Sequence, residues 1–95
     1  MLAGGKVEPA VQITRDGKPV ADAKVFNALL EANGKTVLAE EAATIYKPPS
    51  GDEPSQYAQG ALKIPPGTRD AVLRYRIVLP EGNGERTYDL PVAVK

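Results

Sequence analysis

The side chains best suited to catalytic chemistry are scarce in this sequence. It contains no histidine and no cysteine, and its only methionine is Met1. Without histidine it lacks the usual general base and the commonest transition-metal ligand. Without cysteine it lacks a thiolate nucleophile, a disulfide and a zinc site built on sulfur. We therefore predict that the protein is not an enzyme and that it holds no cofactor.

Oxygen-bearing side chains gather in one glycine-rich turn near the end of the chain. Glu81, Asn83 and Glu85 occupy alternate positions in the sequence EGNGE, and Asp89 follows. Calcium prefers several such ligands on a flexible loop. The complete calcium-loop spacing is absent, so a solvated hairpin turn is favoured and no metal site is predicted.

Two pairs of adjacent carboxylates, Glu40-Glu41 and Asp52-Glu53, have the residue types used in acid–base catalysis. Neither pair lies in a recognisable pocket. Asp52 and Glu53 belong to the proline-rich segment Lys47–Ser55, which is long for a connection in a β-domain. We predict a solvated loop whose two acidic side chains are candidates for contact with a partner.

Arg74 and Arg76 project from one face of the same predicted strand, because they are two residues apart. With Arg86 or Lys63 from a neighbouring strand they would form a strip that binds anionic groups or a partner. Alternatively, they face solvent and pair with Glu85 or Asp89 across the hairpin. The second interpretation is favoured, and both arginines remain candidate partner-binding residues.

The tyrosines could form a stacking surface. Tyr75 and Tyr88 fall on the apolar parity of their predicted strands, so we expect them in the core with the hydroxyl group at the rim. Tyr46 and Tyr57 flank the Lys47–Ser55 loop. They are the better candidates for exposure and for contact with a partner.

Length and charge limit the classes of protein that remain. The 95 residues suffice for one domain with a modest core, and twelve basic and twelve acidic side chains cancel. Because the net charge is zero, no overall electrostatic attraction favours binding to nucleic acid or to an anionic membrane. No apolar run approaches the roughly 20 residues of a membrane span. Residues 1–6 are expected to be a disordered remnant behind a removed export signal, or an ordinary frayed end, and residues 7–95 to form the domain.

The segment Asp16–Val37 (DGKPVADAKVFNALLEANGKTV) carries the clearest architectural signal. The Asp-Gly pair at its start and the Asn-Gly pair near its end are turn signals. Between them, Val25–Ala32 is apolar at both parities, as in a strand buried on both faces. The same residues fit a helix with Asp22 as the N-cap. The strand is favoured, because the segment follows a tight turn so closely.

Alternating apolar residues predict further strands over 7–14, 56–64, 71–79 and 86–94, and shorter ones near 35–38 and 43–46. One helical turn at 40–43 is an alternative to a single irregular strand there. Pro91 places the last strand at an edge or at a bulge. Six to seven short strands predict an all-β fold, a single Ig-like or transthyretin-like antiparallel β-sandwich with at most one short helical turn.

Two segments carry a family resemblance. DGKPVADAKVFNALLEANGKTV resembles the opening of small bacterial extracytoplasmic Ig-like domains of the YtkA-like (FixH-like) kind, and SQYAQGALKIPPG over Ser55–Gly67 is similar to their second block. The resemblance implies a seven-stranded sandwich outside the cytoplasm, often beside transport or metal-handling systems. The lack of histidine and internal methionine departs from the metal-handling relatives.

These observations together predict a non-catalytic binding module of a bacterial envelope protein, in the periplasm or otherwise outside the cytoplasm. It would contact a protein partner through loops and an edge strand. The alternative is a ligand-binding accessory domain, for a carbohydrate or a cation, in a transport or surface system. A fragment of an enzyme whose catalytic residues lie in another domain is a third hypothesis.

Overall fold

The computed structural model describes residues 4–82 and 84–94, which form strands and connecting loops with one 3-10 turn. The strands in chain order are β1 (Lys6–Val7), β2 (Thr14–Arg15), β3 (Lys18–Pro19), β4 (Lys24–Glu31), β5 (Val37–Ala43), β6 (Ile45–Lys47), β7 (Gln56–Ala58), β8 (Leu62–Lys63), β9 (Asp70–Val78) and β10 (Glu85–Ala93). The 3-10 turn, η1 (Pro80–Gly82), connects the last two. The mostly β fold predicted from the sequence is confirmed.

The largest sheet has four antiparallel strands in the order β10-β9-β4-β5. β9 pairs with β10 without a break in register, and with β4 along the whole of that strand. β5 pairs with β4 less regularly, with register shifts on either side of Leu29. β9 and β4 are therefore the regular centre of the sheet. Pro91 lies in β10 at its edge, as its missing N–H group predicts.

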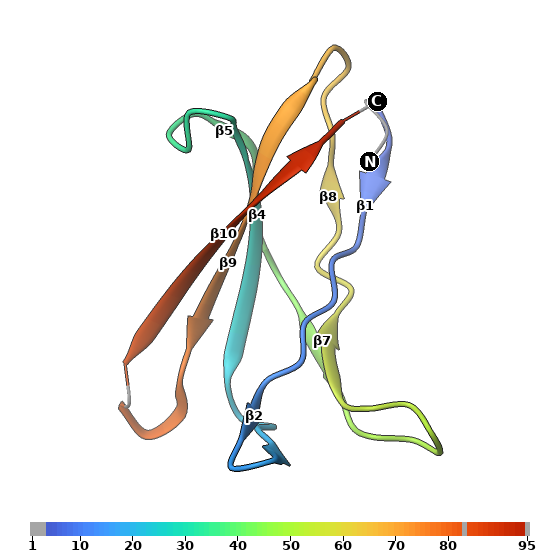
Figure 1. The fold of residues 1–95 in the computed structure, drawn as a ribbon, viewed down its shortest axis with the longest axis vertical. Helices are drawn as coiled ribbons and strands as arrows, with labels where there is room; N and C mark the ends of the chain where they lie inside the picture. The colour runs from blue at the N-terminus through green and yellow to red at the C-terminus, as the bar shows by residue number, and fades with distance from the viewer. Residues whose placement is uncertain (1–3, 83, 95) are drawn as a thin grey trace.

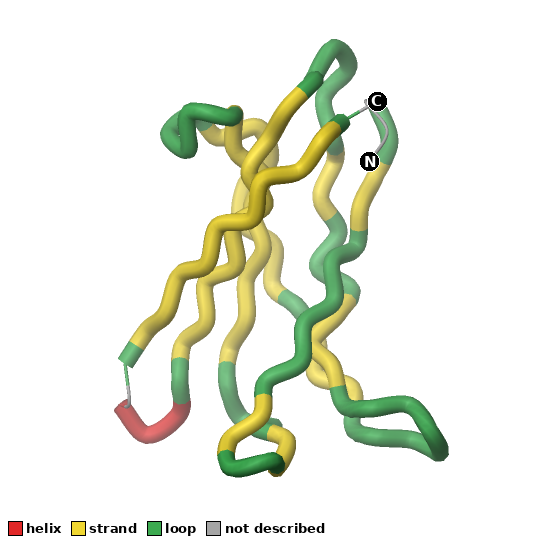
Figure 2. The backbone as a smooth tube through the Cα atoms, in the orientation of Figure 1, coloured by secondary structure: helices red, strands yellow, loops and turns green. Residues whose placement is uncertain are grey.

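A second, less regular layer covers one face of this sheet (Figures 1 and 2). It contains the ladders β1–β8 and β6–β7, which are joined where Val11 and Tyr57 exchange two backbone hydrogen bonds of 3.0 and 2.8 Å. Nearer the start, the N–H of Gly4 donates to the carbonyl of Ile64 (2.7 Å). Residues 4–6 therefore belong to the folded domain, which corrects the disordered segment expected over 1–6; residues 1–3 lie outside the described residues.

Two apolar clusters fill the space between the layers. The larger one joins β4, β8 and β9 to the end of the chain through Leu29, Leu62, Ile64, Ala71, Leu73 and Val94. The smaller one surrounds Tyr57 and includes Ala23, Val25 and Ile77. Burial of one large aliphatic side chain contributes about 1.5–3 kcal/mol, so this packing is the main attachment between the layers.

The segment Val25–Ala32 is a strand for most of its length, since β4 runs from Lys24 to Glu31. Side chains on both of its faces are buried: Val25, Asn27 and Leu29 at one parity, Ala28 and Leu30 at the other. β4 also has a strand on each side. The apolar character at both parities therefore reflects double burial rather than a helical face.

Both predicted turns are confirmed. Asp16 and Gly17 link β2 to β3 with φ values of 53° and 78°, the left-handed pair that a two-residue type I′ hairpin requires. After β4, the Oδ1 atom of Asn33 accepts hydrogen bonds from the backbone N–H groups of Lys35 (2.8 Å) and Thr36 (3.1 Å). The side chain of Asn33 thus closes the second turn.

The strand expected over 56–64 is interrupted, which corrects that prediction. β7 ends at Ala58 and β8 begins at Leu62, and between them Gln59 has a φ of 67°. Gly60 lies so close to β4 and β5 that an added Cβ would be 2.7 Å from Asn27 Nδ2 and 3.2 Å from the carbonyl oxygen of Ala42. The layers approach one another at Gly60, and only a residue without a side chain fits.

Of the two alternatives considered at 40–43, the structure has the irregular strand, because those residues belong to β5; the helical turn among the described residues is η1. One further expectation is wrong in detail. The strand expected over 7–14 is reduced to the ends of that segment and the single bridge at Val11. Pro9 cannot donate a hydrogen bond, which interrupts the ladder between them.

The close contact between Gly60 and the side chain of Asn27 predicts how a substitution at Gly60 changes the stability of the protein. Gly60→Ala should lower the free energy of unfolding by about 1–3 kcal/mol, because the new methyl group overlaps the Asn27 amide. Denaturant unfolding measures the change. In the double variant Gly60→Ala/Asn27→Ala the amide is gone, so the cost should be smaller than the sum of the two single changes; strict additivity would contradict this packing.

Candidate functional site

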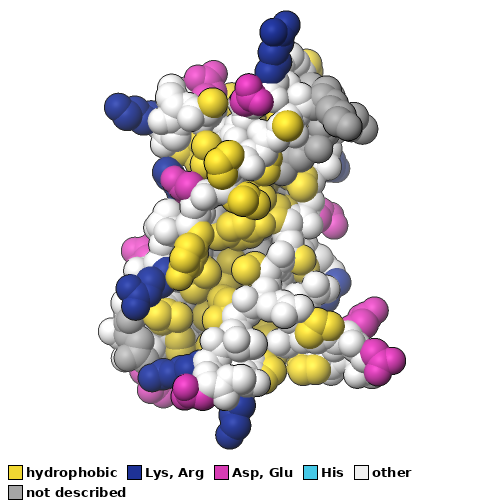
Figure 3. Space-filling model, in the orientation of Figure 1, with side chains coloured by type: hydrophobic (Ala, Val, Ile, Leu, Met, Phe, Trp, Pro, Cys, Tyr) yellow, Lys and Arg dark blue, Asp and Glu magenta, His cyan; other side chains and the backbone are white. Residues whose placement is uncertain are grey.

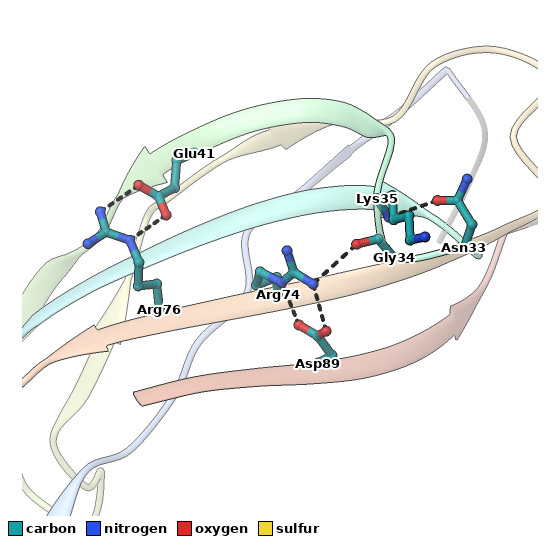
Figure 4. Close-up of polar contacts among 7 residues, drawn as sticks. All are labelled: Asn33, Gly34, Lys35, Glu41, Arg74, Arg76 and Asp89. Atoms are coloured by element: carbon teal, nitrogen blue, oxygen red, sulfur yellow. Dashed lines mark hydrogen bonds and ion pairs between the residues drawn. The ribbon is translucent and has the colours of Figure 1, made fainter. Parts of the chain in front are cut away.

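Arg74 lies on the face of the four-stranded sheet that points away from the second layer (Figure 4). Its Nε and Nη2 atoms donate to the two carboxylate oxygens of Asp89 at 2.7 and 2.8 Å. Nη2 also donates to the carbonyl of Gly34 at 3.3 Å, which ties the β4–β5 turn to β9. This hydrogen bonding holds the pKa of Asp89 below its ordinary value and raises that of Arg74.

Arg76 joins three strands on the same face. Its Nε and Nη2 atoms donate to Glu41 on β5 at 2.7 and 2.6 Å, and Nη1 donates to Glu85 on β10 at 2.8 Å. The guanidinium group also lies 4.4 Å from the centre of the Phe26 ring, in a cation–π contact. The Arg76 hydrogen bond lowers the pKa of Glu41.

The pairing of these arginines with Glu85 and Asp89 across the β9–β10 hairpin, predicted as the favoured interpretation, is confirmed. Glu41 on β5 is an additional partner that the sequence did not reveal. Both guanidinium groups therefore already face carboxylates of this chain. A binding strip for an external anion would first have to break these pairs.

Tyr57 corrects the expectation of an exposed ring, because only 2% of its surface is accessible. Its hydroxyl donates to the carbonyl of Val20 and accepts from the N–H of Ala23 (3.3 Å), and burial raises its pKa. Tyr46 is half-buried and its ring centre lies 5.1 Å from that of Tyr57, at 54°. Tyr57 anchors the second layer, and Tyr46 alone of this pair retains surface for a partner.

The loop between β6 and β7, which contains Asp52 and Glu53, projects from the molecule (Figure 1). The backbone groups of Ser50 and Glu53 exchange two hydrogen bonds of 3.0 and 2.9 Å, and Gly51 between them has a φ of 57°. Both acidic residues are exposed. The loop is therefore a small hairpin that presents two carboxylates to solvent.

The sequence did not reveal an exposed apolar surface on β10. Tyr88 was expected in the core, but 55% of its surface is accessible, as is 51% of the surface of Leu90, two residues further along β10. Their register pairs, Tyr75 and Leu73, lie on the parity of β9 that faces the second layer. The sequence thus predicted correctly which face of β10 these side chains occupy. It did not predict their exposure, because the second layer does not extend over β10.

A hollow of about 420 Å³ lies beside β10, between residues 11–14 on one side and Tyr75, Ile77 and Tyr88 on the other. We call it the β10 groove. Apolar side chains run down this face of the molecule (Figure 3). Tyr75 is half-buried here, and burial raises its pKa. The lining of the groove is mostly apolar and aromatic, with Gln12 and Thr14 as its polar members.

An adjoining hollow of about 420 Å³ extends the groove toward η1 and shares Ile13 and Thr14 with it. Arg15 and Arg86 line this arginine end. Unlike Arg74 and Arg76, neither has an ion pair within residues 4–82 and 84–94. The arginine end is therefore suited to a negatively charged group.

No group of three or more acidic side chains gathers to hold a metal ion in the described part of the chain. Of the possible calcium ligands, Glu85 and Asp89 are bound to arginines, and Asn83 lies outside the described residues. None of the described helical structure has the length and apolarity to cross a bilayer.

Comparisons with protein-family models, with curated proteins and with solved structures give no match for this chain.

The ion pairs of Arg76 predict how stability depends on pH. Because the pKa of Glu41 is lowered, the ionised Glu41 carboxylate paired with Arg76 stabilises the fold fully above its ordinary pKa of 4.5. This stabilisation is lost as the pH falls through the lowered pKa. Arg76→Met should lower the thermal midpoint near neutral pH and weaken its fall in acid. Thermal unfolding between pH 7 and 3 measures both.

The matched control is Arg86→Met, on the same hairpin but without an ion pair in the described structure. It should retain the acid slope of the unchanged protein. Identical pH profiles for all three proteins would contradict the role assigned to Arg76.

Proposed function

We propose that this chain is a non-catalytic interaction module of a bacterial envelope protein, and that it binds a protein partner along β10 and the β10 groove. The observation that carries this proposal is an edge strand of nine residues that exposes Tyr88 and Leu90 beside an apolar hollow. Long regular edges invite pairing with another chain. Exposed apolar patches of this kind are characteristic of contact surfaces.

The two edges of the large sheet differ in a way that favours β10. β5 is shifted in register around Leu29, and such irregularity discourages addition of a further strand. β10 keeps its register with β9 from Glu85 to Ala93. Every residue of β10 except Pro91 has a backbone N–H group that can donate a hydrogen bond. The regular edge is thus also the one that carries the exposed pair Tyr88 and Leu90.

The fold in this proposal is an Ig-like sandwich. The order β10-β9-β4-β5 corresponds to the order G-F-C-C′ in one sheet of a variable-type domain. The second layer, in which β1 lies beside β8 and β7 beside β6, corresponds to the B-E-D part of the other sheet. This correspondence supports a sandwich in which β10 would be the last strand, G.

The location outside the cytoplasm rests on the resemblance of Asp16–Val37 and Ser55–Gly67 to bacterial extracytoplasmic domains. Asp52, Glu53 and Tyr46 form a second candidate contact, at the projecting loop. Arg74 and Arg76 act in this proposal chiefly by holding β10 on the sheet.

Co-purification from a bacterial envelope extract, with cross-linking, tests the function. The bait carrying Tyr88→Lys and Leu90→Lys should recover at least tenfold less of a specific partner than the unchanged bait, because two lysines cannot be buried at the interface. Ile45→Lys is the matched control, since Ile45 is 56% exposed on β6, away from the β10 edge.

A bait in which Asp52 and Glu53 are both changed to alanine separates the loop from the edge. Reduced recovery with this bait alone would move the interface to the loop. Equal recovery by the unchanged bait and the Tyr88/Leu90 double variant would contradict the proposed use of β10.

A further inference from the structure

We propose that the β10 groove seats a β-strand donated by the partner protein, with apolar side chains at alternate positions and an acidic side chain near its N-terminal end. This inference rests on the proposed function, because it specifies how the partner binds at the β10 edge. It is carried by the unpaired backbone groups of β10 and of residues 8–12, by the lining of the groove and by the unpaired charge at its arginine end.

The first free backbone edge belongs to β10. The N–H of Leu79 donates to the carbonyl of Gly84 (2.9 Å), and bonded pairs alternate with unbonded ones along an antiparallel ladder. By this alternation the peptide groups of Tyr88 face β9, whereas those of Thr87 and Asp89 face away from the sheet. β10 has no strand on that side in the described structure.

The second free edge lies across the groove. Val11 directs both of its backbone groups to Tyr57, so the peptide groups of Ala10 and Gln12 point the other way. No backbone partner for this side of residues 8–12 is found within residues 4–82 and 84–94. Unsatisfied donors and acceptors thus border the groove on both sides.

The lining of the groove suits one face of a strand. Val11 and Ile13 are half-buried at alternate positions of their segment, and the half-buried Tyr75 and the buried Ile77 occupy alternate positions of β9. Side chains that alternate along an added strand would lie against this surface. The exposed ring of Tyr88 would be covered in the same way.

The strand order gives the donated strand its direction. In the Ig-like correspondence, the position beside β1 belongs to the first strand, A, for which the described residues provide no strand. A strand there runs antiparallel to residues 7–14 and hence in the direction of β10 (Figure 1). Its N-terminal end then lies beside Arg15 and Arg86, which is where an acidic side chain would pair.

The test uses a defined strand, acetyl-Asp-Glu-Val-Thr-Val-Thr-Leu-Thr-Val-Thr, fused ahead of residue 1 through a flexible glycine–serine linker. Fusion gives the strand a high effective concentration, so weak affinity alone cannot hide its binding. Amide hydrogen exchange should slow at least tenfold at Thr87, Asp89, Ala10 or Gln12. The thermal midpoint should rise relative to a fusion of the same composition without alternation.

Charge reversal tests the polarity of the strand. Arg86→Glu should remove most of the gain in thermal midpoint, and replacing Asp-Glu in the fused strand by Lys-Lys should restore it. Arg69→Glu is the control, since Arg69 is an exposed arginine outside the arginine end. If the rise in thermal midpoint does not depend on these charges, the direction assigned to the donated strand and its acidic N-terminal end are both overturned.

Three outcomes separate this inference from the proposed function. If partner recovery depends on Tyr88 and Leu90 but the fused strand protects no backbone amide, the function stands and strand donation is overturned. If equal protection comes from the non-alternating fusion, strand donation is again overturned. If the unchanged protein is a dimer by light scattering with the same amides protected, a second copy rather than a donated partner strand occupies the groove.

Discussion

The inner face of the four-stranded sheet is broader than the layer that covers it, and the main features of this molecule depend on that mismatch. Where β8 and β7 lie over β4 and β9, side chains such as Leu29 and Leu73 are removed from water and form the core. Over β10 the cover ends. Tyr88 and Leu90 have the right parity for burial but remain half-exposed, so the same hydrophobic pattern that builds the core also leaves an apolar edge.

The opposite face of the sheet is held by charge rather than by a second layer. Arg76 bonds to β5 and β10 from its place on β9, and Arg74 adds a bidentate pair with Asp89. Such pairs keep β10 in register with the sheet without burying it. A rigid edge strand is the element that a binding surface needs, because less conformational freedom is then lost on association.

The sequence predicted what local patterns determine and missed what depends on the width of the second layer. The Asp16-Gly17 turn, the alternation of β9 and the edge position of Pro91 follow from local chemistry. The burial of Tyr57 depends on carbonyl and N–H groups more than thirty residues away. No local signal in the sequence distinguishes the exposed Tyr88 from a buried tyrosine, and the break at Gly60 depends on its close approach to β4 and β5.

Backbone hydrogen exchange of the unchanged protein at neutral pH is the most direct test of a free β10 edge. The account predicts alternation along β10: slow exchange at Arg86, Tyr88 and Leu90, whose amides face β9, and fast exchange at Thr87 and Asp89. Uniform protection of all five amides in a monomer would contradict it, because the edge would then already be paired.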